Sequence, residues 1–200
     1  MRTTLGGVAL LLTIATTATA CGGSGNDASP PATKSPSPAT SSSTPTDPRD
    51  QAKADALAML RRYFVVGDQV GQNPKTPLSK LKSVETSTML AADQHQFEQW
   101  RSSGWKQVGG GGVTKMEVQT VSLNNSDPAK GKVPYVTVLV CTDASGVDVV
   151  DKTGKSQVLP TRPKLLTSEY TIANYHWTAD PANGWRVATA TDKAVGKCTL

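Results

Sequence analysis

The sequence predicts an α+β fold in which N-terminal helices pack across one face of a curved antiparallel sheet. Between residues 47 and 103, apolar side chains recur with the period of an α-helix. After Trp105 the period changes, and four segments rich in β-branched and aromatic residues alternate as strands do. Aromatic residues occur only from Tyr63 onward, so we expect residues 48–200 to form one domain with a single core.

Residues 1–20 are typical of a secretory signal peptide. Arg2 is followed by an apolar run at 5–14 that is too short to span a membrane, and then by small residues. Cys21 comes directly after residues 18–20 (Ala-Thr-Ala), and this arrangement resembles the lipobox of bacterial lipoproteins. The resemblance implies that the thiol of Cys21 carries a diacylglycerol, with acyl chains such as palmitate, and that the protein is held on the extracytoplasmic face of the cell membrane. Residues 18–20 also fit the A-x-A cleavage site of a soluble secreted protein, which remains the alternative.

Residues 21–47 join this predicted anchor to the domain. After Cys21 they are nearly all Gly, Ser, Thr, Pro, Ala, Asn and Asp, a composition that cannot bury enough apolar surface to fold. We therefore expect a disordered tether that holds the domain away from the membrane, within reach of a cell-wall polymer or a neighbouring envelope protein.

The cysteine count supports the same interpretation. An exported protein with three cysteines leaves one of them over, and lipidation of Cys21 leaves Cys141 and Cys198 as an even pair. An oxidising compartment favours a disulfide between them, and neither a CxxC motif nor zinc-like spacing is present. The sequence therefore predicts a Cys141–Cys198 disulfide that closes a loop of about 60 residues.

The first helix is predicted to begin at Pro48, because the carboxylate of Asp47 can cap it and proline suits the first helical position. Gly67 and the polar cluster at 72–74 predict its end. Apolar residues at helical spacing predict its buried face: Ala56, Leu57, Leu60, Tyr63 and Phe64.

A short helical turn is expected at 78–82, and a second helix at 86–103 with Gly104 as its C-cap. The apolar residues that share one face of this helix are Met89, Leu90, Ala92, Phe97 and Trp100. Strands are expected over 113–123, 133–141, 165–177 and 185–191, and the turns between them have the composition of hairpin loops.

The order of these elements, the closing strand pattern at 184–187 (Gly-Trp-Arg-Val) and the late cysteine pair resemble the NTF2-like, cystatin-like domains of exported actinobacterial lipoproteins. The resemblance covers about 150 residues and implies a cone formed by helices and a curved sheet. Because that fold carries enzymes, binding modules and assembly adaptors alike, the resemblance alone does not choose among these classes.

Two functions of such a cone remain open besides partner binding. Members of the superfamily that isomerise ketosteroids or cyclise polyketides use an acid or base inside the cone, and the resemblance would give that role to His176 with Tyr63 or Tyr170 as hydrogen-bond donor. A cone lined by aromatic side chains could instead carry a small apolar ligand. The side chains expected around such a cavity are Tyr63, Phe64, Phe97, Trp100, Tyr170 and His176.

The formal net charge of +5 comes from Lys and Arg residues that are spread along the chain. No dense basic block is present and aromatic residues are few, so a nucleic-acid partner is not expected. No motif indicates a cofactor or a metal site. The sequence therefore favours a non-catalytic envelope module, with the membrane, an envelope protein or a wall polymer as partner, and with a homodimer through the sheet as one way of association.

Overall fold

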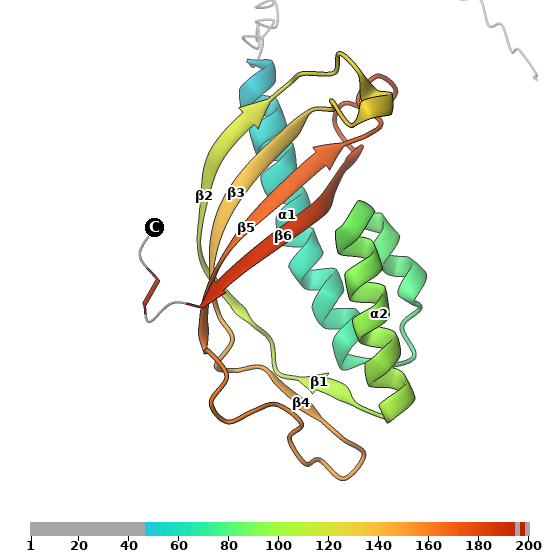
Figure 1. Ribbon diagram of the computed structural model, residues 1–200, viewed down its shortest axis with the longest axis vertical. Coiled ribbons are helices and arrows are strands. Elements are labelled where there is room, and N and C mark those ends of the chain that lie inside the picture. Colours follow the sequence, from blue (N-terminus) through green and yellow to red (C-terminus); the bar gives the residue numbers. More distant parts are fainter. Residues whose placement is uncertain (1–46, 195–196, 199–200) are drawn as a thin grey trace, which may run out of the picture. The chain divides into compact units, whose positions relative to one another are not determined.

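The structure is a computed structural model that describes residues 47–194, 197 and 198. Figure 1 shows its helices beside an antiparallel sheet, which confirms the α+β class. The predicted signal peptide at 1–20, the lipidated Cys21 and the tether up to residue 46 lie outside the described residues. Within the described ranges, no helix has both the length and the apolar character needed to cross a membrane.

The first helix, α1, spans Pro48–Gln72 and begins as the sequence predicts. The carboxylate of Asp47 accepts a hydrogen bond from the backbone N–H of Arg49 at 2.7 Å. The helix ends at Gln72, at the polar cluster at 72–74 that predicts its end. It does not end at Gly67, because the buried Val70 continues the apolar stripe past the glycine for another turn. A glycine inside a helix costs only about 1 kcal/mol, which this extra packing outweighs.

Two shorter helical segments and a second α-helix complete the helical part. The 3-10 helix η1 spans Leu78–Ser83, α2 spans Ser87–Ser103, and a second 3-10 turn, η2, spans Pro128–Lys130. Gly104 ends α2 with φ of 72°, a left-handed conformation that glycine adopts without strain. The predicted C-cap is thereby confirmed.

The main sheet has four antiparallel strands in the order β2-β3-β5-β6. The strands span Gly112–Ser122 (β2), Tyr135–Asp143 (β3), Leu165–Asn174 (β5) and Trp185–Ala194 (β6). Each corresponds to a predicted strand, although β5 ends three residues before the predicted boundary at 177. In addition, β1 (Lys106–Val108) pairs with β4 (Asp148–Val150) in a small second sheet that the sequence analysis missed.

The two edges of the main sheet differ. On β2, the register slips between Val113 and Lys115 and again between Val118 and Thr120, so this outer strand is interrupted by two bulges. On β6, a short segment between η1 and α2 covers part of the edge. There the N–H of Val187 donates to the carbonyl of Val84 at 2.8 Å, and the N–H of Thr86 donates to the carbonyl of Val187 at 2.9 Å.

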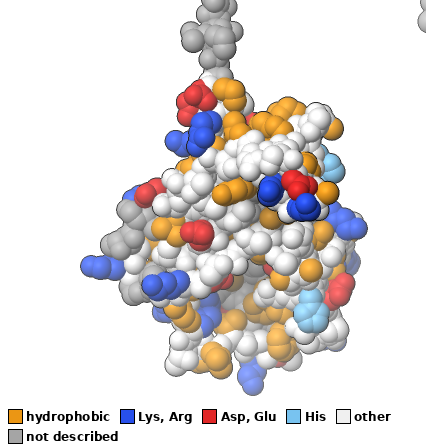
Figure 2. Space-filling view, turned by 45° about the horizontal axis from the view of Figure 1, so that its top comes forward, with side chains coloured by type: hydrophobic (Ala, Val, Ile, Leu, Met, Phe, Trp, Pro, Cys, Tyr) orange, Lys and Arg blue, Asp and Glu red, His pale blue; other side chains and the backbone are white. Residues whose placement is uncertain are grey.

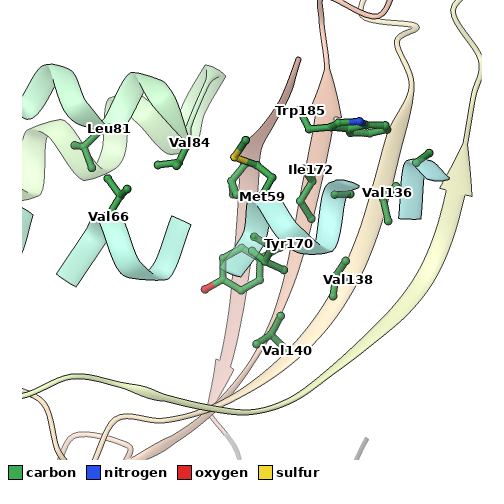
Figure 3. Packing of buried hydrophobic residues seen from close by; sticks show 14 of the residues in the cluster. Met59, Val66, Leu81, Val84, Val136, Val138, Val140, Tyr170, Ile172 and Trp185 are labelled. Carbon is green, nitrogen blue, oxygen red and sulfur yellow. The ribbon is translucent and has the colours of Figure 1, made fainter. Parts of the chain in front are cut away.

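The core lies between α1 and the sheet. Figure 3 shows valines of β3 and Ile172 of β5 facing Met59 of α1, while Val66 packs with Leu81 and Val84 of the segment around η1. Trp185, at the start of β6, is fully buried. The residues with no exposed surface include Ala56, Leu60, Leu81, Val84, Val136, Val138, Val140, Ile172 and Val187.

The predicted disulfide is confirmed. Cys141 is buried on β3, and its Cα lies 5.7 Å from that of Cys198 beyond the end of β6, which is within the normal range for a disulfide. The bond joins residues 57 positions apart in the sequence. It therefore fixes Cys198 to the end of the inner strand β3.

Replacing Cys198 with Ser should lower the free energy of unfolding by about 2–5 kcal/mol, because the unfolded chain regains the freedom of a long loop. Urea denaturation without reductant measures this loss. A reducing agent should destabilise the unsubstituted protein and leave Cys198→Ser unchanged. If both proteins respond to the reductant equally, the disulfide does not contribute to stability.

Candidate functional site

A cavity of about 200 Å³ lies where α1 and β1 meet one end of the main sheet. Figure 2 shows a hollow near the centre of the face in view, with hydrophobic and acidic side chains around it. The cavity takes one wall from α1 and the opposite wall from β5 and the end of β6. The lining residues are Phe64, Asp68, Gln107, Gly111, Val113, Thr142, Ala144, Val147, Leu166, Ser168, Tyr170 and Asp192.

An aromatic cluster forms the inner wall of this cavity. The ring of Phe64 packs edge-on against Tyr170 with centroids 5.6 Å apart, and Tyr63 lies 5.8 Å from Tyr170 and 5.2 Å from Phe64. Such separations are those of favourable aromatic pairs. The hydroxyl of Tyr170 points away from Val138 and Val140 in Figure 3. The cluster thus offers both an apolar surface and a hydroxyl near the cavity.

The polar wall is fixed by contacts between α1 and β1. Gln107 is buried, and its Nε2 donates to Oδ1 of Asp68 at 2.7 Å and to the carbonyl of Gly109 at 3.1 Å. A Cβ atom at Gly71 would lie 2.6 Å from Oε1 of Gln107, so a larger residue there would displace the Gln107 side chain. On the facing strands, Ser168 and Asp192 are register partners.

A buried carboxyl group lies in the packing beside this wall. Glu85, between η1 and α2, is only 2 % exposed, and no donor among the described residues reaches its carboxyl oxygens. Its carboxyl group instead lies within hydrogen-bonding reach of the carboxyl group of Asp93. Burial, and after it the charge of the neighbouring Asp93, raises the pKa of Glu85 to about 9. Glu85 is therefore protonated at neutral pH, in a place where an ionised carboxylate would be strongly disfavoured.

Asp93 of α2 connects this carboxyl to the aromatic cluster. The hydroxyl of Tyr63 donates to Oδ2 of Asp93 at 3.3 Å. Burial raises the pKa of Asp93 and, with nearby negative charge, that of Tyr63. Burial and then the charge of Asp192 raise the pKa of Tyr170. Burial and the neighbouring carboxyl groups thus disfavour negative charge on Asp93, Tyr63 and Tyr170.

The structure brings some of the predicted cavity residues together and separates others. Phe64 and Tyr170 line the cavity, and Tyr63 packs against both of them. Phe97 and Trp100 pair with each other, with centroids 5.3 Å apart, and Phe97 is part of the core. These two residues therefore do not line the cavity, and the prediction is corrected for them.

The prediction for His176 is also corrected. His176 is exposed in the turn that follows β5, and its backbone N–H donates to Oδ1 of Asn174. The cavity lies toward the opposite end of β5, at Leu166, Ser168 and Tyr170. Because β5 ends at Asn174, the segment around His176 is not a strand and does not point its side chains across the sheet.

Sequence reasoning missed the acidic residues of the site. Asp93 lies one helical turn after Leu90 and one turn before Phe97, inside the apolar stripe of α2, whereas the predicted Ala92 is exposed. A carboxylate at an inward-facing helical position was the available indication of a buried polar site. Glu85 had no comparable indication, because its burial results from the pairing of its segment with β6.

The described part of the chain contains no group of three His, Cys, Asp or Glu residues close enough together to hold a metal ion. His95 is exposed on α2, and its ring lies 3.0 Å from the amide nitrogen of Gln99. Lys and Arg side chains are scattered over the face shown in Figure 2 and do not gather in one patch there.

No protein-family model matches the chain, and no curated protein matches it. Among solved structures, the crystal structure of the intermembrane space region of the chloroplast protein ARC6 is similar, with a TM-score of 0.48 and 14 % sequence identity. That match covers 76 % of this chain and 100 % of that chain. What the cavity binds must therefore be inferred from the residues that line it.

Replacing Glu85 with Gln should change how stability depends on pH. The folded-state pKa of about 9 exceeds the ordinary value of 4.5, so the folded protein holds a proton that the unfolded chain releases. Stability from this group is full below about pH 4.5 and is lost as the pH rises toward 9, by at most about 1.4 kcal/mol per pH unit.

Urea denaturation of both proteins between pH 5 and pH 9 measures this effect. We expect the unsubstituted protein to lose stability with rising pH and Glu85→Gln to lose much less. Glu98→Gln, at an exposed position of α2, is the matched control and should behave like the unsubstituted protein. Parallel curves for all three proteins would show that Glu85 ionises normally.

Proposed function

We propose that this chain is a non-catalytic binding module of the cell envelope, which is anchored through a lipid on Cys21 and takes a small ligand into the cavity beside Tyr170. The observation that carries the proposal is the cavity itself, which combines an aromatic wall with a few fixed polar groups. Binding sites for small molecules generally have this combination, in which apolar surface supplies affinity and a few polar groups fix the orientation. The NTF2-like cone is part of the proposal, and the helices that cover one face of the main sheet support it.

The size of the cavity limits the ligand. Sites for drug-sized molecules have about 300–1,000 Å³, whereas this cavity has about 200 Å³. Because the cavity is smaller than the sites that hold drug-sized molecules, its ligand should be smaller in the same proportion, with about ten non-hydrogen atoms. A steroid, a polyketide or a lipid acyl chain would not be enclosed, so the alternative of an apolar carrier is limited to a small apolar ligand.

The placement of His176 favours binding over catalysis. The isomerase or cyclase alternative relied on a histidine base beside a tyrosine donor inside the cone. His176 instead lies in an exposed turn, so the described cavity lacks that base.

A groove along α1 favours a second candidate function, the docking of a protein partner. Two adjoining hollows of about 260 and 350 Å³ lie between α1 and the loop from β5 to β6. Trp177 and Pro181 line the apolar end, and Arg62 and Arg186 line the other. The guanidinium of Arg186 donates to three backbone carbonyls, which holds its charge in place. Asp55 and Asp180 line the same end as the two arginines. The groove therefore offers a partner segment an apolar patch next to side chains of both charges.

The cavity proposal is tested by filling the cavity. Val147→Trp should place a large side chain in it and abolish binding of small fragments with about ten non-hydrogen atoms. Amide chemical shifts report binding, and in the unsubstituted protein they should change near Ser168 and Tyr170. Leu159→Trp, at a position that is 73 % exposed, is the control and should bind normally. Shifts that map to the groove instead would favour the partner-docking function.

The anchor is tested by measuring the intact mass of the mature protein from a membrane fraction. A chain that begins at Cys21 and carries added acyl mass supports lipidation, and Cys21→Ser should move the protein out of the membrane fraction. An unlipidated protein in the medium would support the secreted alternative and leave the cavity proposal unaffected.

A further inference from the structure

We infer that the ligand of this cavity is a small organic cation, an ammonium group joined to an apolar body. This inference rests on the proposed binding function, and it specifies the chemistry that the site recognises. Three features of the described residues carry it. Carboxylates line the cavity wall, the carboxyl groups packed behind that wall have no basic ion-pair partner, and aromatic rings line the same cavity.

The first feature is the charge of the wall. Asp68 and Asp192 line the cavity on opposite sides, one from α1 and one from β6, and none of the described lining residues is Lys or Arg. This contrasts with the chain as a whole, whose formal net charge is +5. Asp192 is exposed, whereas Asp68 is half-buried and its Oδ1 accepts a hydrogen bond from Gln107. Two carboxylates at one cavity favour a cation there by their charge.

The second feature is the absence of a counter-ion in the adjoining packing. Glu85 is 2 % exposed and interacts with the neighbouring Asp93, and the negative charge of Asp192 in the cavity wall acts in turn on Asp93. The two ion pairs found among the described residues, Lys115–Glu117 and Lys130–Asp127, involve none of these carboxyl groups. The carboxyl groups of Asp93 and Asp192 therefore have no basic ion-pair partner among the described residues. A bound cation would supply favourable charge to this cluster.

The third feature is the aromatic surface. Phe64 and Tyr170 both line the cavity, and the electron-rich face of such a ring attracts a cation by about 0.5–2 kcal/mol. The rings also provide apolar contact for the rest of the ligand. A bare metal ion would use neither property, and no three carboxyl groups of the described chain are close enough together to bind one. An organic ammonium compound matches all three features.

A matched pair of probes tests this inference. Benzylamine and benzyl alcohol have the same number of non-hydrogen atoms, but only benzylamine is charged at pH 7. Isothermal titration calorimetry on the full chain should show that benzylamine binds at least about tenfold more tightly, as expected when a charge-assisted contact replaces a neutral one. Asp192→Asn should weaken benzylamine binding by about tenfold and leave benzyl alcohol unchanged.

Asp50→Asn is the matched control, since Asp50 is exposed at the start of α1 and far along the helix from the cavity residues Phe64 and Asp68. It should bind both probes as the unsubstituted protein does. The cation inference would be overturned if both probes bind equally well and Asp192→Asn changes neither affinity. If Val147→Trp nevertheless abolishes this binding, the proposed function of the cavity stands. Binding of neither probe, or binding that Val147→Trp does not affect, would overturn both.

Discussion

The pairing of residues 84–86 with β6 is the constraint on which the site depends. Two backbone hydrogen bonds at Val187 fix this short segment to the edge of the sheet. Because α2 begins directly afterwards at Ser87, the pairing also determines where that helix lies against β6. It places Glu85 in the interior and brings Asp93 within reach of Tyr63. The helices and the sheet thus meet through backbone geometry, and the acidic site follows from it.

The large elements were predictable because each has a strong local pattern. The Asp47-Pro48 start of α1, the left-handed Gly104 and the alternating strands all result from interactions between residues close in the sequence. The errors arose where tertiary contacts decide. Strands β1 and β4 each have three residues, too few for a periodic pattern, and they exist because each has the other as partner. Gly67 interrupts the composition of α1 but not its packing.

The candidate site was predicted only in its aromatic part. Tyr63 and Phe64 were expected in the interior because they share the apolar face of the first helix, and Tyr170 because it lies on a predicted strand of the cone. Carboxyl groups give no such expectation, since most of them are solvated. Their burial here costs free energy, which is consistent with the general observation that sites are less optimised for stability than the rest of a fold. The sequence therefore indicates the scaffold of the cavity more readily than its chemistry.

The bulges of β2 have a consequence for molecules crowded on one surface. A protein that is tethered as we propose meets neighbouring copies at high two-dimensional density, and a long regular outer strand would let one copy add to the next through main-chain pairing. The two register slips on β2 break the row of unpaired backbone groups into short lengths. Such an edge resists self-association into chains of molecules, so the cavity and the groove can remain accessible on each copy.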